Sequence, residues 1–174
     1  AVDQEKIELN FSKIDKHWLS EKFRMTKSLN GKEFDFFLFD DGAMDIVIEK
    51  LEKDQVGLIQ MTQKKTTLEN FEGMGVKIES TLEKLKVVNE TIKIWLKFQK
   101  NWGKLVTIFL KSEDIQKTLR EEYLKFKELD EKFKDQMKIA YDYNTMIDVC
   151  TVERKIILKE MADVIAACEH ALEN

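Results

Sequence analysis

The sequence has no proline and little glycine, and these two shortages constrain its fold. None of the 174 residues is proline, where average usage would give roughly nine, and only six are glycine. Proline and glycine are the residues that most often end helices and form turns. Their scarcity, in a chain rich in Lys, Glu, Leu and Ile, predicts long helices with short connections.

Cysteine and long apolar runs are scarce as well. The two cysteines, Cys150 and Cys168, fall on apolar positions of helical patterns. We therefore expect buried, reduced thiols in a cytosolic protein, with a disulfide as the less favoured alternative. No run approaches the ~18 apolar residues that cross a bilayer, and no secretory leader pattern is present, so no membrane partner is expected.

The remaining composition describes one globular helical unit. Hydrophobic residues make up 43% and charged residues 36%, which excludes a disordered chain. The net charge of −4 is too small to indicate a nucleic acid or another highly charged partner for the whole chain. A helical pattern is still running at the C-terminal end. We therefore expect residues 1–174 to be a single helical segment of a larger chain, with a helix, a hairpin and a helix in residues 1–66. Residues 67–174 should hold a long central helix with two or three helices packed on it.

The most informative stretch is residues 92–115. At helical spacing its side chains form a broad dry face, which consists of Ile92, Trp95, Gln99, Trp102, Val106 and Phe109, flanked by Ile94, Phe98, Leu105 and Ile108. The opposite face carries Lys93, Lys97, Lys100, Lys104 and Lys111. So wide an apolar face must be covered by other helices on two sides. The stretch therefore predicts a central helix, which would be about 60 Å long if it begins near Phe71.

Only residues 22–39 predict β-structure. Asn30-Gly31 is the preferred pair for a type I′ turn, because both central residues need positive φ. Folding the chain around this turn sets Met25 opposite Phe36 and Phe23 opposite Leu38. A lone hairpin is marginal in water, so we expect its apolar face to dock on helices. The predicted fold class is mainly α: an antiparallel bundle of long helices with one small N-terminal β-hairpin.

Capping signals predict where the other helices begin and end. Residues 3–20 form a first helix, with Trp18 and Leu19 turned inward, and Asp40 or Asp41 caps a second helix that runs to about Lys65 with Ile59 inside. Further signals lie at Thr66 with Glu69, at Ser112, and at Thr118 with Glu121. After a break near Asn144 or Thr151, a last helix buries Ile157, Met161, Val164, Ile165, Cys168 and Leu172.

No motif for catalysis or for a metal is present. A phosphate-binding loop needs Gly-x-x-x-x-Gly-Lys-Ser/Thr, and neither Gly31-Lys32 nor Gly103-Lys104 has the first glycine or the final hydroxyl residue. His17 and His170 lack the ligand spacing of a zinc site, and neither has a glutamate three positions before it, as a di-iron bundle requires. The sequence therefore predicts no catalytic site, no cofactor and no metal in this segment.

The five lysines of residues 93–111 have two interpretations. The interleaved aromatic residues point away from them around the helix, so they offer no stacking surface for a nucleic acid. A solvated face is the simpler interpretation, since exposed charges are common on helices. The alternative is a docking face for an acidic protein patch, formed by Lys93, Lys97, Lys100, Lys104 and Lys111.

The central stretch resembles the linker region of dynein heavy chains. That family has Trp, Gln, Trp, Leu, Ile-Phe and Asp-Ile in this order, and the matching residues here are Trp95, Gln99, Trp102, Leu105, Ile108, Phe109, Asp114 and Ile115. The resemblance extends to Leu51-Glu52-Lys53-Asp54-Gln55, and further to Phe126, Asp130, Phe133, Met137 and Cys168-Glu169. The family usually has Leu-Pro-Glu at residues 119–121, whereas this chain has Arg120 at the position of the proline.

This resemblance implies a mechanical role. Dynein linkers are mostly helical levers that lie across a ring of AAA+ ATPase modules, and the motor moves along microtubules. The implied partners are the ring and the rest of the linker of the same chain, with ATP and Mg bound elsewhere. Microtubules and other dynein subunits would be contacted through other parts of the chain. The implied location is cytoplasmic and cytoskeleton-associated. The acidic run from Phe126 to Met137 resembles axonemal more than cytoplasmic heavy chains, which would place the motor in a cilium or flagellum.

Two alternatives come from other classes of protein. A freestanding helical scaffold or adaptor of spectrin-like architecture would have self-contained ends and a defined partner. An enzyme built in a helix bundle would need a bound metal or cofactor, which elemental analysis would detect.

The central-helix interpretation predicts that Trp95→Ala and Trp102→Ala each lower the free energy of unfolding by ~3–5 kcal/mol, because a large buried side chain is lost. Thermal melting of each variant measures the effect. A melting curve like that of the parent for both variants would show that these tryptophans lie on the surface.

Overall fold

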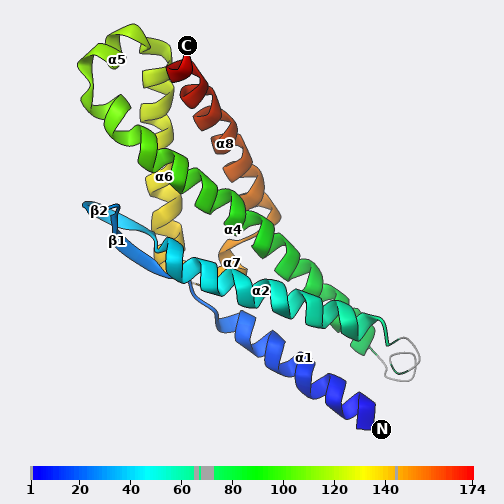
Figure 1. The fold of residues 1–174 in the computed structure, drawn as a ribbon. Coiled ribbons are helices and arrows are strands. Elements are labelled where there is room, and N and C mark those ends of the chain that lie inside the picture. The colour runs from blue at the N-terminus through cyan, green and yellow to red at the C-terminus, as the bar shows by residue number, and fades with distance from the viewer. Residues whose placement is uncertain (1, 65–66, 68–72, 144) are drawn as a thin grey trace.

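The computed structural model describes residues 2–64, 67, 73–143 and 145–174. It is mainly helical with one N-terminal hairpin, as predicted (Figure 1). The elements, labelled as in Figure 1, are α1 (Val2–Ser20), β1 (Met25–Leu29), β2 (Lys32–Phe39), α2 (Asp41–Thr62), α4 (Met74–Lys111), α5 (Glu113–Thr118), α6 (Arg120–Tyr143), α7 (Met146–Val149) and α8 (Val152–Glu173).

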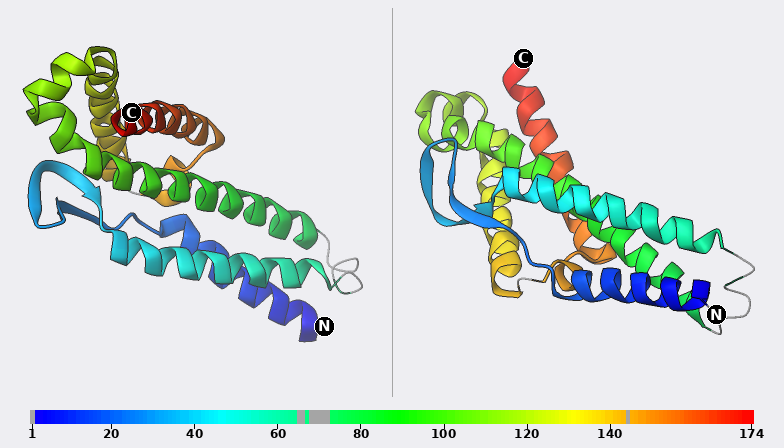
Figure 2. Two further views of the ribbon diagram at one scale, coloured as in Figure 1. Left: turned by 45° about the horizontal axis from the view of Figure 1, so that its top comes forward. Right: turned by 60° about the horizontal axis from the view of Figure 1, so that its bottom comes forward.

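The predicted central helix is α4. It runs without interruption for 38 residues, which is about 57 Å. The helices α2 and α8 pack on opposite sides of it, and α6 covers its C-terminal half (Figures 1 and 2). The helix α1 lies along α2 and runs in the opposite direction (Figure 2). The broad apolar face predicted for this stretch is therefore covered from more than one side, which is the arrangement its width requires.

The core follows α4 and is richest in aromatic rings where the hairpin meets α4 and α6. Trp102 lies 5.0 Å from Phe133 of α6 and 5.2 Å from Phe34 of β2 between ring centroids. Trp95 meets Phe39 edge-on at 4.9 Å. Such edge-to-face and tilted ring pairs stabilise the fold by more than the burial of their apolar surface alone. They hold the hairpin against the helices, as its apolar face predicts.

The hairpin turn is confirmed, but the predicted strand register holds only beside it. Asn30 and Gly31 have positive φ values of 53° and 77°. Leu29 pairs with Lys32, whereas beyond an irregularity Met25 pairs with Phe39 instead of Phe36. Beyond the shift, the backbone of Phe39 binds a helix side chain, which is described next. Phe23 precedes β1 and is buried against Phe39 and Trp95, so its predicted pairing with Leu38 is also wrong.

Gln99 explains why a glutamine lies on the dry face of α4. It is fully buried, its side-chain oxygen accepts from the N–H of Phe39, and its amide donates to the carbonyl of Phe39, both at 2.9 Å. One side chain therefore satisfies both backbone groups of a buried strand residue, as a neighbouring strand would do. This contact fixes the end of β2 on the C-terminal half of α4.

Four apolar residues predicted to lie inside are instead exposed: Leu19 at 53%, Ile59 at 45%, Ile108 at 39% and Ile157 at 39%. Each is adjacent in sequence to a buried residue, and these neighbours are Trp18, Leu58, Phe109 and Leu158. Successive helical residues point about 100° apart. The helix that covers the buried neighbour therefore leaves the adjacent side chain at the edge of the interface.

Helix ends agree with the capping signals in part. Asp40 and Ser112 accept hydrogen bonds from the N–H groups of Ala43 and Ile115, as predicted, and Thr151 caps α8. The predicted Thr118–Glu121 box is wrong, because Leu119 both ends α5 and accepts the first hydrogen bond of α6. Arg120 is then the first residue of α6, a position where the expected proline would fit equally well. The signals at Thr66, Glu69, Phe71 and Asn144 lie outside the described residues.

Both cysteines are free and buried, as predicted. Burial raises the pKa of the Cys150 thiol well above its ordinary value and is also the main cause of the raised pKa of Cys168. Both thiols are therefore protonated at neutral pH and poor nucleophiles.

Replacing Gln99 should show how much the hairpin depends on this single side chain. Gln99→Leu leaves the buried N–H and C=O of Phe39 unsatisfied, and each costs about 1–3 kcal/mol, so the free energy of unfolding should fall by about 2–6 kcal/mol. Urea denaturation measures the change. Gln116→Leu is the control, since Gln116 makes one bond, to the carbonyl of Phe109, from a partly exposed position. Equal losses in the two variants would contradict a special role for Gln99.

Candidate docking face and its structural supports

The lysine face lies where the sequence predicts it. Lys93, Lys97, Lys100, Lys104 and Lys111 are all exposed on α4, while Trp95, Gln99 and Trp102 are buried on the other side. The docking role of these lysines stays a prediction.

The surroundings divide the five lysines into groups. Lys93 forms an ion pair with Glu52 of α2, with 3.3 Å between nitrogen and oxygen. Lys111 lies in the last turn of α4, where a cation is favoured by the helix dipole. The other three lysines, Lys97, Lys100 and Lys104, line one groove with a cavity volume of about 540 Å³.

The opposite wall of this groove is acidic. Asp41 and Asp45, from the first turns of α2, line it together with Leu29 and Asn30 at the hairpin tip and Leu96 of α4. Partial burial and then the nearby carboxylates of Asp45 and Asp40 raise the pKa of Asp41, while Lys100 acts in the opposite direction. The groove therefore has a basic wall from α4 and an acidic wall from α2, and its lining also includes apolar side chains.

The residues on which the family resemblance rests differ in burial, because some lie in the core and others on the surface. Trp95, Gln99, Trp102 and Phe109 are fully buried, and Phe109 stacks on Phe126 of α6 with 5.0 Å between ring centroids. Ile115 of α5 is partly buried against the core, whereas Ile108 and Asp114 are exposed. The buried members thus join α4 to the hairpin and to α6.

Trp102 also makes a buried polar contact that sequence reasoning missed. Its indole N–H donates to Asp130 of α6 at 2.7 Å, and the other carboxylate oxygen of Asp130 pairs with Lys134 at 3.1 Å. Burial alone would lower the pKa of Lys134, but the hydrogen bond and charge of Asp130 raise it overall. Asp130 is only 3% exposed, so these two partners replace the water that its carboxylate has lost.

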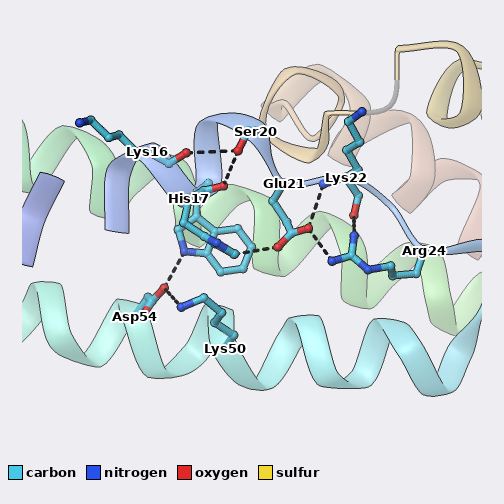
Figure 3. Close-up of polar contacts among 9 residues, drawn as sticks. Lys16, His17, Ser20, Glu21, Lys22, Arg24, Lys50 and Asp54 are labelled. Atoms are coloured by element: carbon cyan, nitrogen blue, oxygen red, sulfur yellow. Dashed lines mark hydrogen bonds and ion pairs between the residues drawn. The ribbon is translucent and has the colours of Figure 1, made fainter. Parts of the chain in front are cut away.

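The same arrangement joins α1 to α2. The indole N–H of Trp18 donates to Asp54 at 2.8 Å, and Lys50 lies 3.2 Å from the same oxygen (Figure 3). Beside it, Glu21 binds His17, the N–H of Lys22 and Arg24, which fixes the connection from α1 to β1 (Figure 3).

A sequence signal for these buried acids exists. Asp54 lies between the buried Leu51 and Leu58, and Asp130 lies between the buried Phe126 and Phe133, all at helical spacing. An aspartate on an apolar helix face needs a buried donor, and tryptophan is the donor best suited to an apolar contact. Which tryptophan meets which aspartate follows only from the tertiary structure.

The described residues contain neither a metal-binding cluster nor a helix that could span a membrane. Over residues 2–64, 67, 73–143 and 145–174, no group of three or more His, Cys, Asp or Glu side chains could hold a metal ion. None of the described helices is long and apolar enough to cross a bilayer.

The two central tryptophans should respond differently to a change that keeps the aromatic ring. The indole N–H of Trp95 has no hydrogen-bond partner among the described residues, while that of Trp102 binds a buried carboxylate. Trp102→Phe should therefore cost about 1.5–3 kcal/mol more in unfolding free energy than Trp95→Phe. Denaturant unfolding of both variants checks this. If both variants lose the same free energy, the Trp102–Asp130 bond adds nothing to stability.

Comparison with known proteins gives one consistent result. The family described as dynein heavy chain, N-terminal region 2, matches residues 1–174. The chain is 30% identical over 133 residues to the dynein beta chain of the flagellar outer arm of Chlamydomonas reinhardtii. This match covers 75% of this chain and 3% of that protein. The chain is 27% identical over 173 residues to mouse (Mus musculus) dynein axonemal heavy chain 17, covering 99% of this chain and 4% of that protein. A cytoplasmic dynein heavy chain of Paramecium tetraurelia is 30% identical over 129 residues, 74% of this chain and 3% of that protein.

The chain therefore spans only 3% to 4% of the length of these relatives, and the match lies in one defined part of a very long protein. The match to the family covers every residue of the chain, including the buried Trp102, Gln99 and Asp130 described above. The chain belongs to the dynein heavy chain family, in which it corresponds to N-terminal region 2.

Proposed function

We propose that this segment is a non-catalytic mechanical linker of a dynein heavy chain. It would act as a stiff part of the lever over the AAA+ ATPase ring, and bending and straightening of the whole linker would convert ATP-driven changes into movement along microtubules. ATP and Mg would bind elsewhere in the chain. The proposal combines membership of the dynein heavy chain family with the architecture of the segment.

The observation that carries the proposal is the continuity and support of α4. A lever transmits force only if it resists bending, and α4 is one helix of 38 residues that helices support on opposite sides. Buried hydrogen bonds from Gln99 and Trp102 tie it to β2 and α6. These contacts favour motion of the segment as one body over bending within it.

The immediate partners in this proposal are the ring and the remaining linker of the same heavy chain. Microtubules and other dynein subunits would be reached through other parts of the motor. Axonemal relatives favour a motor of the cytoskeleton in a cilium or flagellum, and a cytoplasmic relative keeps the other setting open. The freestanding scaffold alternative has no observation in its favour once the family is established.

A kink in α4 should slow movement along microtubules without stopping ATP hydrolysis. Glu83 is exposed in the interior of α4. Glu83→Pro removes a helical hydrogen bond and kinks the helix at a cost of ~3 kcal/mol or more, and Glu83→Gly softens it at ~1 kcal/mol. In the heavy chain that carries this segment, we expect microtubule gliding to slow several-fold with proline and less with glycine. ATP hydrolysis should continue, because the ring is unchanged.

Glu83→Ala is the matched control, since it removes the same side chain and keeps the helix. Gliding at the parental speed with Glu83→Pro would contradict the lever. So would a parallel loss of ATP hydrolysis and movement in the folded glycine variant, because the segment would then act on the chemistry itself.

A further inference from the structure

Three lysines of α4 line one groove, and this shared position distinguishes them from the other lysines without an ion-pair partner. Lys50, Lys93, Lys125, Lys132, Lys134, Lys138 and Lys155 all have a carboxylate within ion-pair distance. Within the part of the chain that the structure describes, Lys97, Lys100 and Lys104 have none, although Asp41 and Asp45 line the opposite wall of the same groove. Their charges face an open groove.

The groove is held in shape by the hairpin tip. A Cβ atom at Gly103 would lie 2.8 Å from the end of the Leu29 side chain, so glycine at position 103 lets Leu29 of the hairpin tip pack closely on α4. The ammonium group of Lys32 donates to the hydroxyl of Thr107 of α4 at 3.2 Å, which is a second contact between the hairpin tip and α4. These contacts keep Leu29 in place in the lining of the groove, where Leu96 of α4 is the other apolar side chain.

We propose that this groove is the docking site for an acidic segment of the same heavy chain that lies outside residues 1–174. Its carboxylates would meet Lys97, Lys100 and Lys104, and an apolar side chain would cover Leu29 and Leu96. This proposal rests on the proposed lever function, since it names the kind of surface on which the lever rests.

The spacing of the lysines defines the carboxylates that fit. Lys97, Lys100 and Lys104 follow steps of three and four residues, so they span about 10 Å along α4 at intervals of about 5 Å. Carboxylates on one face of a helix have the same spacing. The acidic wall formed by Asp41 and Asp45 repels a uniformly anionic ligand such as a nucleic acid. It therefore favours a protein segment, whose charges differ from one side to the other.

The weakness of exposed ion pairs favours a tethered occupant. Each such pair changes an association constant by about one- to fivefold, so three pairs give at most a factor of about 100. That factor is too small to recruit a free protein. A segment of the same chain is instead present at an effective concentration on the order of millimolar, where a weak contact is populated. A contact of this strength also releases easily, as a lever that moves repeatedly requires.

Zero-length coupling of amines to carboxylates tests the proposal on the intact heavy chain. Cross-linked peptides are identified by mass spectrometry, and the Lys93–Glu52 pair serves as the internal positive control. We expect Lys97, Lys100 or Lys104 to be linked to aspartate or glutamate outside residues 1–174 of the same chain. Links only to Asp41 or Asp45, links to microtubules, or no links while Lys93–Glu52 is found would each overturn the proposal.

Charge reversal gives a functional readout. Lys97→Glu, Lys100→Glu and Lys104→Glu together should abolish the links and slow microtubule gliding several-fold while the melting temperature of the chain is kept. The matched control reverses Lys53, Lys77 and Lys127, which are also exposed, and should leave gliding unchanged. Unchanged gliding in the first variant would overturn the docking site. If Glu83→Pro still slowed gliding, the lever function itself would stand.

Discussion

The structure depends on covering the wide apolar face of α4. A face that spans most of a helix is soluble only when neighbours pack on it from several directions, and α2, α6, α8 and the hairpin do so here. Because each neighbour is placed by its contact with α4, the arrangement of the whole segment follows from one helix. The lysine face is the part of α4 that these neighbours leave exposed.

Apolar packing brings the elements together, but a few buried polar contacts select their relative positions. Gln99 satisfies both backbone groups of Phe39, and Trp102 and Trp18 each donate to a buried aspartate on the facing helix. A displacement by one residue would leave a carboxylate or a backbone group buried without a partner. These contacts therefore penalise alternative registers more strongly than they add to net stability.

The lever proposal and the docking proposal assign different duties to the two sides of α4. The buried side joins the segment into one body, which suits force transmission. The exposed side offers a charged groove whose contacts are individually weak and therefore reversible. A motor element that must hold a position and then leave it needs both properties, a stiff body and a releasable contact.

Local patterns determined much of this protein: the Asn30-Gly31 turn, the Asp40 and Ser112 caps, the continuous α4 and its lysine strip all follow from residue type and spacing. The family also followed from sequence, through the order of Trp95, Gln99 and Trp102. Only the tertiary structure decided the shifted register of β2, the exposure of Ile108, the partners of Asp54 and Asp130, and the groove beside Lys100. The reason is physical. Caps and helical faces arise from residues within a few positions of one another, whereas register, pairing and grooves depend on how distant segments approach.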